Sequence, residues 1–355
     1  MVLINILFFA AGLFLLVHGS EFLVKSAASI AKKFGVSELI IGLTLVALGT
    51  SIPELASAVI ASIRHDSGLI IGNVVGANIA NICLIIGLAG ALGFIKTTKE
   101  MLKRDGYLML AVAVLMYVFV LNGTISKLEG AIFLLLYLAY VFFLYETKGE
   151  HEEKRHFREF IKYFFGFKYM VTIKSRLISE FNNMKSKNLA PQAKSQIKEL
   201  FKAGIIKDIL IIALSGVAIV LGANYFITSA ANFAELFNVP HTVIGLSLVS
   251  LGTTLPELAV SVSAARKGFG DIAIGNVLGS NITNVLLVLG VAGSIHPLSI
   301  LNITKFFSGP YLLLMSILFL FFIKNKWYIR KREALALLFL YVLFILFLFF
   351  VFSHY

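Results

Sequence analysis

The stretch Gly42-Leu-Thr-Leu-Val-Ala-Leu-Gly-Thr-Ser-Ile-Pro-Glu54 joins an apolar helical run to a proline and a carboxylate. The same arrangement returns as Gly245-Leu-Ser-Leu-Val-Ser-Leu-Gly-Thr-Thr-Leu-Pro-Glu257. A proline within a helix removes one backbone hydrogen bond and clashes with the preceding turn, so each copy predicts a helix that breaks just before its glutamate. A carboxylate inside an apolar membrane span is costly and marks function. The two copies therefore predict one cation site between two halves of the chain.

The composition is that of a membrane protein. The 355 residues are 59% hydrophobic and 14% charged, and the mean hydropathy is +0.91. Soluble domains are about half apolar and about a quarter charged. The net charge of +12 comes from Lys and Arg in short loops and one central segment, a pattern typical of membrane topology rather than nucleic-acid binding. The single cysteine, Cys83, excludes a disulfide framework within the chain and is predicted to be buried.

Apolar runs of about 20 residues are long enough to cross a bilayer. Ten are present: Leu3–Ile30, Ser37–Ile63, Gly68–Ile95, Tyr107–Asn122 and Leu128–Tyr145 before a polar middle, and Ile205–Phe233, Thr242–Ala264, Ile272–Ile295, Phe307–Ile323 and Ala334–Phe352 after it. The sequence thus predicts an all-α polytopic membrane protein. Its parts are a five-helix repeat at 1–147, a basic loop at 148–203 and a second five-helix repeat at 204–355.

The charges of the loops predict the orientation. Lys and Arg gather in every odd-numbered loop, including Lys96–Arg104, the 148–203 segment and Lys324–Arg332. Such loops stay in the cytoplasm. We therefore expect a multi-pass protein of the cell membrane with both termini extracellular and the 148–203 loop cytoplasmic. The run Leu3–Val17 lacks a basic flank and is interpreted as a span rather than a cleaved signal peptide.

The two halves repeat each other with a constant offset. Adding 203 carries Gly19 to Gly222, Thr50 to Thr253, and Glu54 to Glu257 without a gap, and the register continues to Gly87 and Gly290. Because each half has an odd number of spans, the second half enters the membrane inverted. This is the plan of secondary transporters, in which broken helices place the substrate site near the bilayer midplane.

The paired motifs offer oxygen ligands, which hard cations such as Ca²⁺ and Na⁺ require. Beside Pro53, carbonyls near Val46, Ala47 and Thr50 are expected to lose their helical partners, and Thr50 and Ser51 add hydroxyls to Glu54. The second copy supplies the Ser250 and Thr253 carbonyls, the Thr254 hydroxyl and Glu257. Two carboxylates balance one divalent ion, or hold monovalent ions in turn.

A companion motif, Gly72-Asn-Val-Val-Gly-Ala-Asn-Ile-Ala-Asn81, recurs as Gly275-Asn-Val-Leu-Gly-Ser-Asn-Ile-Thr-Asn284. Its glycines allow helices to approach closely, and its later asparagines are expected on a helix that follows a glycine break. The amides either supply neutral oxygen to an ion or only join two helices. Outside the motifs, Glu21 and Lys25 are spaced to form an ion pair on one helix.

The 148–203 segment leaves two interpretations open. Its aromatic and basic run Phe157–Tyr169 predicts an amphipathic helix on the anionic cytoplasmic leaflet, where it would contact lipid head groups. Alternatively, it is a partly ordered linker whose charge only fixes the topology.

The motifs Gly-Thr-[Ser/Thr]-x-Pro-Glu, each followed by Gly-Asn-x-x-Gly-[Ala/Ser]-Asn-Ile-x-Asn, resemble the two alpha repeats of the calcium/cation antiporter superfamily, especially its prokaryotic sodium/calcium exchangers. The alpha-1 motif covers 42–87 and the alpha-2 motif 245–290. The resemblance implies a secondary active antiporter, not an enzyme, with no cofactor and with Ca²⁺ and Na⁺ as transported ions. It implies that Na⁺ flowing inward expels Ca²⁺. The implied ligands are Glu54 and Glu257 with backbone oxygens near Thr50 and Thr253 for Ca²⁺, atoms around Ala47, Ser51, Ser250, Thr254 and Ser280 for Na⁺, and Asn81 and Asn284 lining the centre.

Two departures from the family pattern concern the ions. Many relatives have serine where this chain has Ala77, so one Na⁺ site lacks a hydroxyl that Ser280 keeps. Neutral Asn81 and Asn284 argue against a potassium-dependent exchanger. An H⁺/Ca²⁺ exchanger of the same fold and a passive cation channel remain alternatives, while no Ser/His pair or His-Glu-x-x-His motif within the spans suggests an enzyme.

Overall fold

The computed structural model describes residues 2–34, 37–93, 95–146, 157–167, 204–236 and 250–353. The elements of the first half are α1 Val2–Phe34, α2 Glu38–Ile41, η1 Gly42–Val46, α3 Ala47–Thr50, α4 Ile52–Ile63, α5 Ser67–Ala80, η2 Asn81–Ile85, α6 Ile86–Leu92, β1 Ile95–Lys96, α7 Lys99–Met101, η3 Leu102–Gly106, α8 Tyr107–Leu121, β2 Thr124–Ile125, α9 Lys127–Glu146 and α10 Phe157–Phe165. Those of the second half are α13 Ile205–Leu236, α15 Ser250–Arg266, α16 Gly270–Thr283, η6 Asn284–Leu289, α17 Gly290–Ile295, β3 Leu298–Ser299, η7 Thr304–Ser308, α18 Gly309–Lys326, β4 Tyr328–Ile329 and α19 Lys331–Ser353. The elements named η are single π-helical turns.

Helices of membrane-spanning length dominate the described residues. Seven are long and apolar enough to cross a bilayer, and a bent pair, Glu38–Thr50 with Ile52–Ile63, makes an eighth candidate. These eight coincide with eight of the predicted spans, and the other two overlap α15 and α19. Because 242–249 lie outside the described residues, the number of ten spans stays a prediction.

The first predicted break is confirmed, but the second is not. The bent pair turns by 44° at Ser51, and Pro53 lies in the first turn of α4. Proline is tolerated there because the amide it lacks would have no helical partner. Pro256, in contrast, lies inside a continuous α15, so the expected break before Glu257 is wrong. Residues 237–249, directly before Ser250, lie outside the described ranges.

The predicted glycine break before Asn78 is also wrong, because Gly72 and Gly76 lie inside α5. The irregular geometry comes three residues after Asn78. The π-turn η2 begins at Asn81, and η6 begins at its counterpart, Asn284. Single π-turns within α-helices occur frequently at functional sites.

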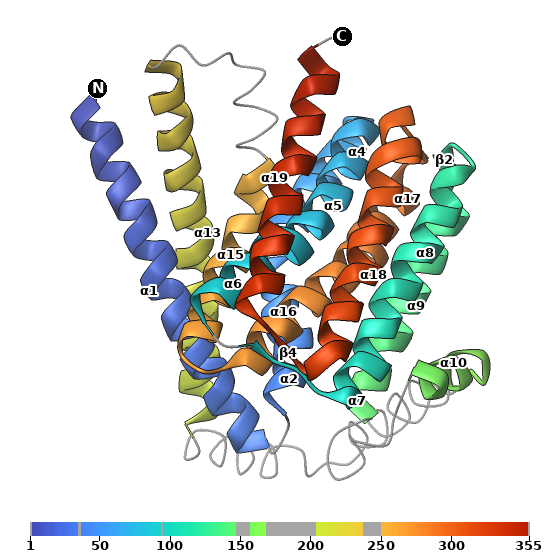
Figure 1. Cartoon of the computed structure of the whole chain (residues 1–355), viewed down its shortest axis with the longest axis horizontal. Coiled ribbons are helices and arrows are strands. Elements are labelled where there is room, and N and C mark those ends of the chain that lie inside the picture. The colour runs from blue at the N-terminus through green and yellow to red at the C-terminus, as the bar shows by residue number, and fades with distance from the viewer. Residues whose placement is uncertain are drawn as a thin grey trace, which may run out of the picture.

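Two very short antiparallel sheets qualify the all-α prediction. Strand β1 pairs with β4, and β2 pairs with β3. Each sheet therefore joins the first half of the chain to the second. The β2 strand lies at the end of the molecule that carries both termini, whereas β4 and α10 lie at the opposite end (Figure 1).

The core is built by close approach of helix backbones. A side chain on Gly42 would lie 2.8 Å from the Ile272 carbonyl oxygen, and one on Gly275 would lie 2.7 Å from that of Leu39. One on Gly279 would lie 2.6 Å from both the Leu43 carbonyl oxygen and the Ala47 side chain. The glycines at 275 and 279 therefore pack α16 against the α2–α3 segment, as predicted. At Gly72 the prediction of close approach is wrong, because no described atom lies within 4 Å of an added carbon.

Outside this core, α1 and α13 stand side by side at the edge of the molecule (Figure 1). The predicted Glu21–Lys25 ion pair is wrong. Glu21 instead lies 3.3 Å from Lys267, at the end of α15, while the Lys25 ammonium lies 6.0 Å from the Phe22 ring centroid. Lys267 comes from a different part of the chain, so the spacing of residues along α1 could not predict this pair.

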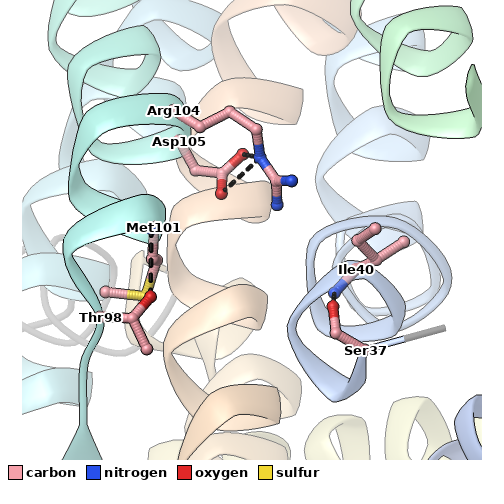
Figure 2. A network of polar contacts seen from close by, with 6 residues as sticks. All are labelled: Ser37, Ile40, Thr98, Met101, Arg104 and Asp105. Carbon is pink, nitrogen blue, oxygen red and sulfur yellow. Dashed lines mark hydrogen bonds and ion pairs between the residues drawn. The ribbon is translucent and has the colours of Figure 1, made fainter. Parts of the chain in front are cut away.

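A polar network marks the end of the molecule opposite the termini. The Ser37 and Thr98 hydroxyls accept hydrogen bonds from the Ile40 and Met101 amides and cap α2 and α7 (Figure 2). Between them, buried Arg104 donates from Nε to both carboxylate oxygens of Asp105 at 3.1 Å. Pairing offsets part of the cost of burying the two charges.

The amphipathic helix predicted within the middle segment is present as α10. Its Phe160 and Tyr163 side chains are buried against Phe143 of α9. The described part of the segment, 157–167, is thus a helix docked on the protein. The rest of the 148–203 loop lies outside the described residues, and its contact with lipid stays a prediction.

The packing at Gly279 can be tested with alanine. We expect Gly279→Ala to lower the unfolding temperature in detergent, because overpacking a core costs about 1–3 kcal/mol. The control is Gly216→Ala on α13, where no described atom lies within 4 Å of the added carbon. That change should leave stability equal or higher, because alanine favours the helix by about 0.5–1 kcal/mol. Equal effects of the two substitutions would contradict the close packing.

Candidate ion-binding site

The two glutamates of the repeated motifs meet in the buried centre. Glu54 lies in the first turn of α4 and Glu257 in the middle of α15. Their side chains are 0% and 1% exposed, and they are near enough to repel each other electrostatically. Burying a carboxylate costs several kcal/mol unless a cation or hydrogen bonds compensate it. The centre of the molecule therefore requires positive charge.

The buried carboxylates have few protein partners. Both oxygens of Glu54 and Oε2 of Glu257 are buried and accept no hydrogen bond from the described residues. Native proteins rarely leave buried polar atoms without a partner. Such oxygens are well suited to coordinate a metal cation.

Hydroxyl–amide pairs connect the two halves on either side of the glutamates. Thr50 donates to Oδ1 of Asn276 at 3.2 Å, and Thr253 donates to Oδ1 of Asn73 at 3.0 Å. The 203-residue offset relates these two bonds to each other. Thr50 and Asn276 are buried, whereas Thr253 and Asn73 are half-buried, so one side of the site is more accessible than the other.

Ser51 makes a second set of contacts between the two halves. The Ser51 hydroxyl lies 3.3 Å from Oε1 of Glu257 and 3.3 Å from the Ser280 hydroxyl. At the position equivalent to Ser280 stands Ala77, which is buried and brings no oxygen. The Ser51 hydroxyl thus lies between Glu257 and the Ser280 hydroxyl, whereas the position equivalent to Ser280 in the other half carries only a methyl group. The departure at Ala77 is a real asymmetry of the site.

The asparagines of the companion motif form a bridge. Asn284 donates to Oδ1 of Asn78 at 3.1 Å, and Asn78 donates to the Asn281 backbone carbonyl at 3.2 Å. The Oδ1 atoms of Asn81, Asn281 and Asn284 are buried and have no hydrogen-bond partner among the described residues. Asn78 therefore joins helices, while Asn81 and Asn284, both predicted to line the centre, retain neutral oxygens for an ion.

The remaining predicted ligands have different outcomes. The Ala47 carbonyl accepts from the Ser51 amide at 3.0 Å and lies 3.3 Å from the Thr50 hydroxyl, so the expectation that it loses its helical partner is wrong. Thr254 is buried in α15. Ser250 begins α15, but its side chain lies outside what is described.

Asn73 and Asn276 were not among the ligands predicted from the sequence. The amide of Asn276 donates to Ser261 at 3.0 Å, which orients its oxygen toward Thr50. The offset of 203 could have indicated their importance, because it makes the pair Thr50 and Asn276 equivalent to the pair Thr253 and Asn73.

The donor set fits hard cations. Among the described residues no group of three or more His, Cys, Asp or Glu side chains gathers as a metal site. The centre instead combines two carboxylates with hydroxyl, amide and carbonyl oxygens. Ca²⁺ prefers such all-oxygen surroundings, and a site of limited charge also suits Na⁺.

Comparison with known proteins decides the family. The model of the sodium/calcium exchanger protein family matches residues 4–146 and 207–350. The chain belongs to the sodium/calcium exchanger family. The sodium/calcium exchanger MaX1 of Methanosarcina acetivorans is 50% identical over 342 residues, which cover 96% of this chain and 97% of that protein. The inner membrane protein YrbG of Escherichia coli is 29% identical over 87% of this chain and 85% of that protein.

The fold agrees with that family. Structures of the sodium-calcium exchanger NCX_Mj match with a TM-score of 0.75 and 26% identity, over 97% of this chain and 98% of that one. The chain is therefore an antiporter of the Na⁺/Ca²⁺ exchanger type in a membrane, and it is a transporter rather than an enzyme.

The uncompensated charge at Glu54 predicts an effect on stability. In buffer free of Na⁺ and Ca²⁺, Glu54→Gln should raise the unfolding temperature, because the neutral amide is less costly to bury without a cation. The control is Glu129→Gln. The Glu129 carboxylate accepts from the Ser126 amide and hydroxyl at 2.7 and 2.8 Å, bonds worth about 1.5–3 kcal/mol to a charged acceptor, so this substitution should lower the temperature. An unchanged or lower unfolding temperature for Glu54→Gln would show that other groups already compensate the charge of Glu54.

Proposed function

We propose that the protein extrudes Ca²⁺ from the cell by alternating access, using the inward Na⁺ gradient. The observation that carries this proposal is the pair of buried glutamates, with three carboxylate oxygens that have no hydrogen-bond partner among the described residues. One Ca²⁺ neutralises both carboxylates, and Na⁺ ions replace it on the same oxygens. Because one set of ligands serves both ions, binding of either excludes the other, which couples their movements.

We propose specific ligands for the two ions. Glu54 and Glu257 hold Ca²⁺ together with backbone oxygens near Thr50 and Thr253. The Na⁺ sites use oxygens around Ala47, Ser51, Ser250, Thr254 and Ser280. Asn81 and Asn284 add neutral oxygens at the centre. This assignment is supported by the partnerless oxygens of both asparagines and by the contacts of Ser51 with Glu257 and Ser280.

Two inverted five-helix repeats, 1–147 and 204–355, would provide the alternation. Corresponding elements support this arrangement. The π-turns η2 and η6 are related by the offset of 203, and so are strands β1 and β3. The sheet that contains β1 lies opposite the sheet that contains β3 (Figure 1). Repeats of opposite orientation give a transporter two related conformations, each open to one side.

The orientation follows from charge. The end opposite the termini carries α7 and α10, which contain Lys99, Arg158 and Lys162, and β4, which Arg330 follows (Figure 1). Basic loops stay in the cytoplasm. We therefore place the 148–203 loop inside the cell and both termini outside. NCX_Mj, the structural relative, has been studied for extracellular ion exchange and induced occlusion of its binding site, which supports a mechanism that occludes the ions here.

Ca²⁺ uptake into proteoliposomes tests the proposal. An outward Na⁺ gradient should drive uptake of radioactive Ca²⁺, while an outward H⁺ gradient or no gradient should not. Glu257→Gln should abolish the driven uptake and still give a monodisperse protein with the wild-type helix content. Uptake driven only by H⁺ would move the protein to proton coupling, and uptake that needs no gradient would indicate a channel. Either result would refute Na⁺-coupled exchange.

The asymmetry at Ala77 gives a further prediction. Ala77→Ser should increase the apparent Na⁺ affinity of exchange, because it adds the hydroxyl that Ser280 supplies in the other half. The measurement is the Na⁺ concentration for half-maximal Ca²⁺ efflux. Ser280→Ala is the matched change and should weaken Na⁺ binding. If Ala77→Ser leaves the Na⁺ dependence unaltered, this position does not contribute to a Na⁺ site.

A further inference from the structure

A cavity of about 500 Å³ lies between the peripheral helices α1 and α13 and the helices α6 and α15. Figure 1 shows α1 and α13 as a pair at one edge, with α15 and α6 facing them. The described residues that line the cavity include none of the candidate ion ligands. Its volume is within the range of about 300–1,000 Å³ that is usual for small-ligand sites.

Two helical stripes line the cavity, and both change from apolar to polar. On α15 the stripe consists of Leu255, Leu258, Ala259, Val262, Ser263 and Arg266. On α1 it consists of Leu13, Leu16, Val17, Ser20 and Glu21. Spacings of three and four residues place each set on one helix face. The polar ends of the two stripes meet, because Glu21 lies 3.3 Å from Lys267. The cavity thus has a long apolar part and one charged end.

The charged end carries an excess of positive charge. Arg266 and Lys267 both line it, and Glu21 balances only one of them. Arg266 is exposed. Beside it, the Ser263 hydroxyl is buried and has no hydrogen-bond partner among the described residues. A guanidinium and an ammonium at one end suit an anionic group with several oxygen atoms.

The rim of the apolar part faces the surroundings of the spans. Leu13 and Leu92 line the cavity and are 47% and 60% exposed, and α1 is a candidate membrane span. An acyl chain of the bilayer can therefore enter from the side. Lipid is the ligand that offers an apolar chain and an anionic head group in one molecule.

We propose that this cavity binds one anionic phospholipid, with an acyl chain along the apolar stripes and the phosphate at Arg266 and Lys267. The position equivalent to Arg266 in the first half is Ile63, although Lys267 has a cationic counterpart in Arg64, so the equivalent positions of the described residues do not repeat the pair of cations. The site would therefore bind lipid from only one of the two leaflets. The positively charged end lies on the side where basic loops gather, and the cytoplasmic leaflet is the anionic one.

Bound lipid would change the stability of the packing between the helix pair α1 and α13 and the rest of the molecule. These two helices contact the rest of the molecule in large part through α15, and the cavity lies beside this contact. An acyl chain there adds apolar contacts to both sides. The lipid composition would then change the stability of this attachment without touching the ion ligands.

Tryptophan fluorescence tests the proposal in the full chain. Trp327 is the single tryptophan, so Trp327→Phe gives a silent background. Leu88→Trp then places a reporter in the cavity, and Leu214→Trp, at a side chain of α13 that is 69% exposed, reports on bulk lipid. Both proteins are reconstituted in bilayers that contain phosphatidylglycerol or phosphatidylcholine with brominated acyl chains, which quench nearby tryptophan.

We expect the cavity reporter to be quenched at a lower mole fraction of brominated phosphatidylglycerol than of phosphatidylcholine, by roughly fivefold for each cation that contacts the head group. The bulk reporter should show no such preference. Equal quenching of the cavity reporter by both lipids would overturn the anionic head-group site. Quenching of the cavity reporter by neither lipid would overturn occupancy by an acyl chain.

Substitutions locate the two parts of the ligand. Arg266→Gln should reduce the preference for phosphatidylglycerol roughly fivefold. Arg64→Gln, the control, removes an exposed cation at the position equivalent to Lys267 and should leave the preference unchanged. Ala259→Phe should fill the cavity and reduce quenching by both lipids. A preference that Arg266→Gln leaves undiminished would place the anionic lipid elsewhere, for example at the basic 148–203 loop, and would refute the proposal.

Discussion

The burial of two carboxylates at the centre of an apolar protein is the constraint on which the rest of the structure depends. Glu54 and Glu257 are almost fully removed from solvent, and each charge left without compensation would cost several kcal/mol. The protein supplies no buried lysine or arginine beside them among the described residues. Arg104, which is buried, pairs with Asp105 in η3. Compensation is thus left to mobile cations, and in the proposed mechanism this is what allows the site to exchange one ion for another.

Close packing of helices keeps this arrangement in place. Neutral oxygens must surround the glutamates from several helices at once, which requires backbones to lie nearly in contact. Gly42, Gly275 and Gly279 make this possible between the α2–α3 segment and α16. The Thr50–Asn276 bond then fixes the two elements relative to each other. The same residues that look like simple packing motifs therefore determine where the ligands stand.

The sequence predicted the features that local rules control and missed those that need a partner. Proline chemistry located the bend at Ser51, and the 203-residue offset paired Glu54 with Glu257. The same proline rule failed at Pro256, because α15 runs through it as one helix. The partner of Glu21 could not be predicted either, since Lys267 reaches it from a different helix. The π-turns at Asn81 and Asn284 had no local signal, because no residue type requires a π-turn. The ten-span count rests on the apolar runs of the sequence, and the roles of the individual ligands rest on the repeated motifs.

The departures from internal symmetry have a consequence for transport. If two inverted repeats were identical, the conformation open to the outside and the one open to the inside would have equal free energies. Differences between the halves shift that balance, because a population shift requires an interaction that distinguishes the two states. Ala77 occupies the position equivalent to Ser280 in the repeat, and Ile63 occupies the position equivalent to Arg266. In the functions proposed above, the first difference acts at the ion site and the second at the membrane. A hydroxyl that holds Na⁺ in only one half, and a cation that holds a lipid at only one end, would each favour one conformation. The ion gradients set the direction of net exchange, whereas positions where the halves differ set which conformation is favoured and thus the apparent affinities on the two sides. The shared positions provide the proposed site itself.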